Sequence, residues 1–193
     1  MPLLFQAEDF VQLLKHVAIH TGIVLLLLFL RDNVLCIPTI FVSYNGETLD
    51  KKAPLLKSAE AISKQATRIV NLFKDKDIKQ VNAMVGLEQE YFLIDKELYK
   101  QRKDLVHTGR TLFGSMPPKS MDIRGHYFGS IPNRVQAFMK DVDEELWKLG
   151  IYAKTEHNEV APCQFEIAPL FIDANVAVDQ NLIIMDVLKK ESR

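Results

Sequence analysis

Residues 81–95 read VNAMVGLEQEYFLID and alternate between two kinds of side chain. The odd-numbered positions are mostly apolar, whereas the even-numbered positions include Glu88 and Glu90. Because successive side chains of a strand point to opposite faces, the pattern predicts a β-strand whose odd-numbered face packs on a core. The two glutamates then share the other face, about 6.5–7 Å apart.

A second acidic motif follows at residues 157–169, which read HNEVAPCQFEIAP. Pro162 interrupts this stretch, so we expect two strands, over residues 152–160 and 164–169. If Ala161 to Gln164 form a four-residue turn between them, Glu159 stands directly opposite Glu166, with Cβ atoms about 5 Å apart. Like charges in that position are destabilising unless a cation lies between them.

The four carboxylates of these motifs are therefore candidate metal ligands: Glu88, Glu90, Glu159 and Glu166. Crowded carboxylates resist desolvation, and a hard divalent cation such as magnesium or manganese offsets their repulsion. The alternative is that each one is an ordinary surface carboxylate at a sheet edge. His157 shares the face of Glu159 and is either a hydrogen-bonded sheet histidine or a group that orients a substrate or ligand. The remaining histidines have no ligand-like spacing: His16, His20, His107 and His126.

The rest of the chain completes an α+β pattern. Apolar positions at helical spacing predict a helix over 54–73 that covers a sheet, and two more helices over 132–149 and from Asp173 to the basic pair at 189–190. Residues 35–44 are rich in β-branched and aromatic side chains and predict a strand. Residues 109–132 hold many glycines and prolines and predict a long loop. We expect helices packed on a mostly antiparallel sheet.

Composition bounds the class of protein. The 193 residues are 48% apolar and 25% charged, which is typical of one soluble globular domain or a large part of one. A formal charge of -1 gives no overall attraction to nucleic acid or to anionic lipid, so neither is an expected partner. Cys36 and Cys163 lie far apart without a CxxC pattern, which favours reduced thiols in the cytoplasm.

One apolar run, residues 23–30, raises the question of targeting. It is shorter than the roughly 18–20 residues that a spanning helix needs. It is similar to the apolar core of a signal peptide, but Arg31, Asp32 and Asn33 follow where a small-x-small cleavage site should be. We expect a cytoplasmic protein without a membrane partner, and the role of this run stays open.

The two acidic motifs and five further segments resemble, in order, glutamine synthetase of type III. The segments are CIPTIFVSY (36–44), APLLKS (53–58), GLEQEYFLID (86–95), TGRTLFG (108–114), HYFGSIP (126–132), HNEVAPCQFEIAP (157–169) and NVAVD (175–179). The resemblance covers residues 34–193 and implies the N-terminal part of the catalytic domain, a curved, mostly antiparallel sheet with covering helices. Residues 1–33 do not resemble the family and form an atypical leader.

The resemblance implies a carbon–nitrogen ligase that joins ammonia to the γ-carboxylate of glutamate, with ATP as co-substrate and γ-glutamyl phosphate as intermediate. Two magnesium or manganese ions take part. Glu90, Glu159 and Glu166 match the three ligands of the ion beside glutamate, and Glu88 matches one ligand of the ion that holds the nucleotide phosphates. Family members assemble as large homo-oligomeric rings.

The chain also departs from the family pattern. It ends at Arg193, before the family's Asn-Gly-Ser-Gly segment, the ATP-site histidine, the substrate-binding arginines and the last metal glutamate, and the family's β-grasp domain is absent. We therefore expect an incomplete chain that is inactive and does not form the ring by itself. The alternative is a non-catalytic fragment or pseudoenzyme that retains one divalent-metal site. Another ligase of the same architecture, such as a glutamate–cysteine ligase, is not expected to share residues 126–132.

Overall fold

A computed structural model describes the chain at residues 29–31, 33–41, 43–73, 77–112 and 126–193. The chain divides into two compact units, residues 1–53 and 54–193. Most of the apolar run 23–30 and most of the predicted loop 109–132 lie outside the described residues. Among the helices that are described, none is both long enough and apolar enough to cross a membrane.

The first unit contains a short hairpin. Strands β1 (Phe29–Arg31) and β2 (Val34–Cys36) pair antiparallel, and Asn33 turns the chain between them with a positive φ of 64°. The predicted strand over 35–44 is wrong beyond Cys36 at the residues that the structure describes, 37–41, 43 and 44. Downstream, the backbone N–H of Phe41 donates to the carboxylate of Asp50 at 2.6 Å, where a strand would use a neighbouring carbonyl.

Helix α2 (Lys52–Val70) begins two residues before its predicted start and ends three residues before its predicted end. Pro54 lies in its first turn, where the missing N–H costs nothing. Ile62 and Ile69 of its apolar stripe are 61% and 58% exposed. The prediction that this stripe covers a sheet is therefore not met within the described residues.

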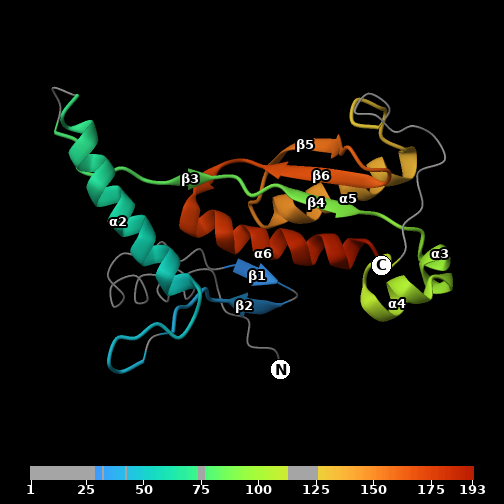
Figure 1. Ribbon diagram of the computed structural model, residues 1–193, viewed down its shortest axis with the longest axis horizontal. Coiled ribbons are helices and arrows are strands. Elements are labelled where there is room, and N and C mark those ends of the chain that lie inside the picture. The colour runs from blue at the N-terminus through green and yellow to red at the C-terminus, as the bar shows by residue number, and fades with distance from the viewer. Residues whose placement is uncertain (1–28, 32, 42, 74–76, 113–125) are drawn as a thin grey trace. The chain divides into compact units, whose positions relative to one another are not determined.

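The second unit is built on a three-stranded antiparallel sheet of order β4-β6-β5, formed by β4 (Gln89–Phe92), β6 (Gln164–Pro169) and β5 (Ala153–Asn158) (Figure 1). A separate pair joins β3 (Met84–Val85) to β7 (Ile172–Asp173). The predicted strand 81–95 is thus split at Gly86. A Cβ at Gly86 would meet the carbonyl oxygen of Pro169 at 2.8 Å, so the chain needs glycine at this close approach.

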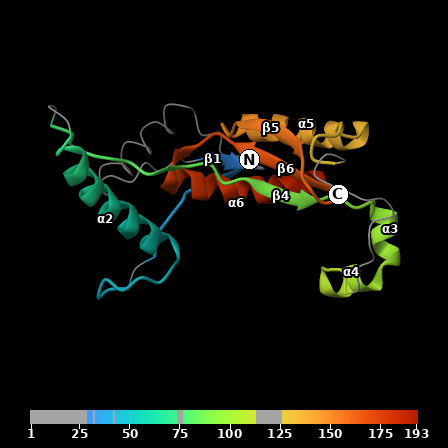
Figure 2. The same cartoon turned by 45° about the horizontal axis from the view of Figure 1, so that its top comes forward.

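Helices α5 (Asn133–Lys148) and α6 (Ala174–Glu191) pack against one face of the sheet (Figure 2). Their contacts form the core, whose buried members are Val142, Leu146, Ile151, Ile167, Ile184, Val187 and Leu188. Tyr91 packs on this core, while Glu88 and Glu90 are exposed, so the odd-numbered face of the first motif is the core face, as predicted. The start of the last helix is confirmed too, because Asp173 caps α6 by accepting the N–H of Asn175.

Two short helices, α3 (Lys96–Gln101) and α4 (Lys103–Thr108), follow β4 and were not predicted. Asp95 caps α3 by accepting the N–H groups of Glu97 and Leu98. The same carboxylate accepts from Arg134 of α5 at 2.8 Å. The Asp95 carboxylate therefore links the segment after β4 to the first turn of α5 by hydrogen bonds.

Candidate metal site on the acidic face of the sheet

Strand pairing brings both acidic motifs to one face of the sheet. Glu166 in the central strand β6 stands opposite Glu90 of β4 on one side and opposite His157 of β5 on the other. Residues directly opposite in an antiparallel pair point to the same face. We call this the acidic face, and it carries Glu88, Glu90, His157, Glu159 and Glu166.

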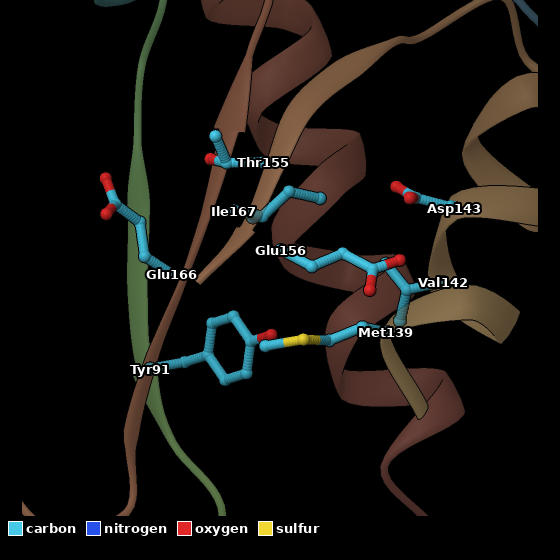
Figure 3. Close-up of a pocket in the computed structure, with 8 residues that line it drawn as sticks. All are labelled: Tyr91, Met139, Val142, Asp143, Thr155, Glu156, Glu166 and Ile167. Atoms are coloured by element: carbon cyan, nitrogen blue, oxygen red, sulfur yellow. The ribbon is translucent and has the colours of Figure 1, made fainter. Parts of the chain in front are cut away.

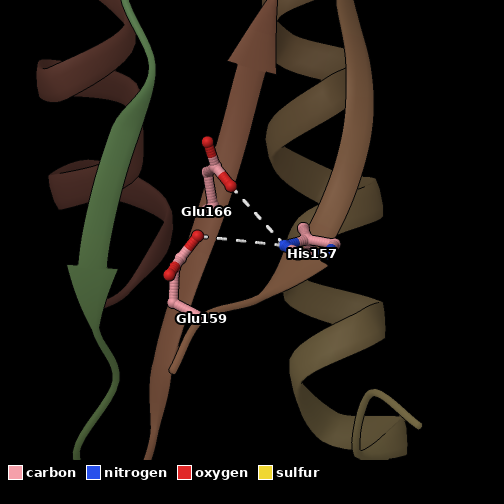
Figure 4. A group of neighbouring side chains, drawn as sticks. All are labelled: His157, Glu159 and Glu166. Carbon is pink, nitrogen blue, oxygen red and sulfur yellow. Dashed lines mark ion pairs between the residues drawn. The ribbon is translucent and has the colours of Figure 1, made fainter. Parts of the chain in front are cut away.

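Three of these side chains converge on a common point, as Figure 4 shows. Nδ1 of His157 lies 3.5 Å from Oε2 of Glu166 and 4.0 Å from Oε1 of Glu159. One ligand atom from each of the three residues lies within 4.8 Å of the other two. The His157 Nδ1 atom is buried, and none of the described residues forms a hydrogen bond with it.

Glu166 carries the strongest electrostatic perturbation of this group. Burial raises its pKa to about 7, and hydrogen bonding and charge repulsion from Glu159 and Glu88 act in the same direction. The side chains of Glu88 and Glu159 therefore both contact Glu166. A carboxyl group in this setting keeps its proton near neutral pH unless a cation replaces that proton.

Glu90 lies on the same face, but another contact occupies its carboxylate. Oε2 of Glu90 accepts a hydrogen bond from Nε2 of Gln164 at 3.0 Å. Gln164 is two residues before Glu166 on β6, so it shares the acidic face. The structure thus brings Glu88, Glu159 and Glu166 together with His157 and places Glu90 beside them with its carboxylate bonded to Gln164.

The predicted pairing of Glu159 with Glu166 is wrong by two residues. His157 stands opposite Glu166, and the N–H of Glu159 donates to the carbonyl of Gln164. The cause is the turn at residues 161–164, in which Pro162 is followed by Cys163 at a positive φ of 60°. This is the pattern of a type II turn, closed by the N–H of Gln164 donating to the carbonyl of Ala161 at 3.1 Å, so Gln164 pairs with Glu159 instead of lying within the loop.

The donor set fits a divalent cation. Three neighbouring carboxylates supply the anionic oxygens that magnesium and manganese prefer, and an imidazole nitrogen is a ligand that manganese also accepts. The buried Nδ1 of His157 lacks a hydrogen-bond partner within the described residues, so it has a lone pair or a proton available for a ligand.

The helix-covered face holds a second acidic pair, beneath α5. Asp143 of α5 and Glu156 of β5 line a small pocket with Tyr91, and Glu166 points away from them to the other side of the sheet (Figure 3). Burial and the nearby Glu156 raise the pKa of Asp143 to about 6. Burial also raises the pKa of the Tyr91 hydroxyl. Sequence periodicity gave no sign that these two carboxyls would meet.

Three further contact residues of the site were also missed: His126, Tyr127 and Gln164. His126 was set aside for lack of ligand-like spacing, yet its Nδ1 bonds the backbone carbonyl of Glu159. The rings of Tyr127 and His157 are in a T-shaped arrangement, with centroids 4.8 Å apart. Only the resemblance of segment 126–132 pointed to this part of the chain.

Comparison with known proteins places this chain in a family of ligases. The sequence model of the family "glutamine synthetase, catalytic domain" matches residues 63–193. The sequence model of the family "glutamine synthetase type III N terminal" matches residues 23–58. The second match begins within the stretch 1–33 that was set apart on sequence grounds. The chain belongs to the glutamine synthetase family, and within it to type III.

The relatives support the same assignment. The chain is 54% identical to glutamine synthetases of Butyrivibrio fibrisolvens and Bacteroides fragilis over 84% and 86% of its length, and 47% identical to the type-3 glutamine synthetase of Dictyostelium discoideum over 82%. It spans less than a quarter of each relative, 22–23%. A cryo-EM structure of Plasmodium falciparum glutamine synthetase shares the fold, with a TM-score of 0.56 at 20% identity, over 86% of this chain and 33% of that one.

Proposed function

We propose that the acidic face is the metal-binding part of a glutamine synthetase active site, which ligates ammonia to the γ-carboxylate of glutamate with ATP. In this proposal Glu90, Glu159 and Glu166 hold one magnesium or manganese ion and Glu88 contributes to a second. The observation that carries it is the convergence of Glu159, Glu166 and His157 within 4.8 Å.

The chemistry explains why the site collects carboxylates. Glutamate and ATP are both anionic, so phosphoryl transfer between them needs positive charge on both sides of the transferred group, and divalent cations supply it. The role of the chain's own residues is to position those charges. The sheet fixes Glu90, His157 and Glu166 in register, and the turn holds Glu159 beside them.

His157 is proposed to orient a bound group. Its Nδ1 faces Glu166 and Glu159, while its ring is held by Tyr127. In this structure the side chain of Gln164 donates a hydrogen bond to the carboxylate of Glu90. For Glu90 to bind the same ion as Glu166, this hydrogen bond must open, and the 3.0 Å contact is an exposed one that costs only about 0.5–1.5 kcal/mol to lose.

Titration calorimetry with manganese tests the proposal. Replacing Glu159 or Glu90 by glutamine removes one anionic ligand oxygen, and we expect each change to weaken binding at least about tenfold. Glu60→Gln, an exposed glutamate of α2, is the matched control and should leave the affinity unchanged. If neither Glu159→Gln nor Glu90→Gln alters manganese affinity, the metal site is not on this face.

A further inference from the structure

We propose that residues 126–129 form a clasp on the edge strand β5, and that His126 and Asn158 are positioning residues for Glu159. This proposal rests on the proposed metal site, because it treats Glu159 as a ligand of the divalent cation. No residue of the clasp contributes a carboxylate to the acidic face. The clasp acts through the backbone of the turn.

Glu159 needs such support because it lies one residue beyond the end of β5. Its N–H donates to the carbonyl of Gln164 at 2.9 Å, which is the last bond of the hairpin. Its carbonyl oxygen forms a hydrogen bond with Nδ1 of His126. Since a carbonyl oxygen only accepts, the Nδ1 atom must carry the proton, and both backbone groups of Glu159 are then fixed.

The second bond of the clasp lies one residue earlier. Asn158 is 3% exposed, and its Nδ2 donates to the carbonyl of Gly129 at 2.8 Å. The ring of His126 lies 5.7 Å from that of Phe165, the cross-strand partner of Asn158. The two polar bonds are therefore made beside a buried aromatic ring, where exclusion of water strengthens them.

The clasp reaches both faces of the edge strand. Gly129 binds Asn158, which shares a face with Phe165, whereas Tyr127 contacts His157 on the acidic face with rings at 81°. Neighbouring residues of a strand point to opposite sides, so the segment wraps around β5. It thereby restrains His157 and Glu159 together.

The orientation of the Glu159 carboxylate follows from the same backbone. Its Oε2 accepts the N–H of the next residue, Val160, at 3.1 Å. A shift of the Glu159 carbonyl would move the adjoining peptide group and with it this N–H. Breaking the His126 bond should therefore turn Oε1 away from His157 and Glu166.

Manganese affinity of conservative variants tests the clasp. His126→Phe keeps a ring against Phe165 but removes the donor, and we expect binding about 10–100-fold weaker than in the unmodified chain. His126→Asn places an amide donor where Nδ1 stood and should restore most of the affinity, which a mere loss of packing would not allow. His107→Phe, an exposed histidine of α4, is the matched control and should bind normally.

A second measurement examines the clasp without any metal. Nitrogen NMR of the neutral imidazole should show His126 protonated on Nδ1, since the hydrogen bond sets the tautomer. A proton on Nε2, or a His126→Phe chain that binds manganese as tightly as the unmodified chain, would overturn the proposal. If Glu159→Gln has no effect on manganese binding while His126 is protonated on Nδ1, the clasp stands as a structural contact and the metal site is what fails.

Discussion

At the scale of single residues, two groups of carboxylates lie on opposite faces of the sheet, whereas in the sequence these carboxylates are scattered. Glu166 and its neighbours occupy the acidic face, while Asp143 and Glu156 meet beneath α5. Both settings raise a carboxyl pKa, to about 7 for Glu166 and to about 6 for Asp143. Of these two groups of described residues, the one on the acidic face combines carboxylates with an imidazole, which is why it is the proposed metal site.

Replacing Asp143 by asparagine should stabilise the protein above pH 6. The native pKa of about 6 lies above the ordinary 3.8, so the native state holds a proton that the unfolded state releases, and stability falls as pH rises between these values. Because the group is only partly buried, we expect a gain of roughly 1 kcal/mol at pH 8 and none at pH 3.5.

Thermal melts of Asp143→Asn across pH measure this effect. The matched control is Asp141→Asn, an exposed aspartate of the same helix, which should change little at either pH. Equal stability of the unmodified and Asp143→Asn chains at pH 8 would show that burial does not penalise this charge.

At the scale of elements, sequence periodicity identified most of the second unit. The strand 164–169, the cap of α6 at Asp173 and the core face of the first motif were all predicted, because each depends on local pattern. The pairing of Glu159 with Glu166 was not, because register depends on the conformation of the turn. Pro162 was visible in the sequence, but the positive φ of Cys163 was not.

The site could be predicted in part for the same reason. The acidic residues stand out as motifs, and antiparallel pairing of the two motifs brings Glu90 opposite Glu166. Contacts of His126 and Gln164 with the site depend on how a loop folds back and on which way an amide points. Neither leaves a periodic signal.

The turn itself offers a test at this scale. Cys163→Gly should raise the free energy of unfolding by roughly 0.5–1 kcal/mol. A left-handed conformation costs a residue with a Cβ about 1–2 kcal/mol, and glycine avoids this cost. The larger conformational entropy that glycine loses on folding offsets part of the gain. Cys163→Ala is the control and keeps the strain without the thiol, so it should be close to neutral. Urea unfolding compares them, and equal stabilities for glycine and alanine would contradict the strained turn.

At the scale of the whole molecule, the fold and the family membership agree. The helices α5 and α6 cover one face of a three-stranded sheet and the acidic face is the other, which is the arrangement expected for the part of a glutamine synthetase catalytic domain that the chain matches. The chain spans 22–23% of the relatives it matches.

The central claim is that the acidic face, and not the helix-covered face, binds the divalent cation. An anomalous difference map from crystals soaked in manganese tests it most directly. We predict the strongest peak within bonding distance of the carboxylates of Glu159 and Glu166. A strongest peak beside Asp143 and Glu156, or no peak on the acidic face at saturating manganese, would contradict the account.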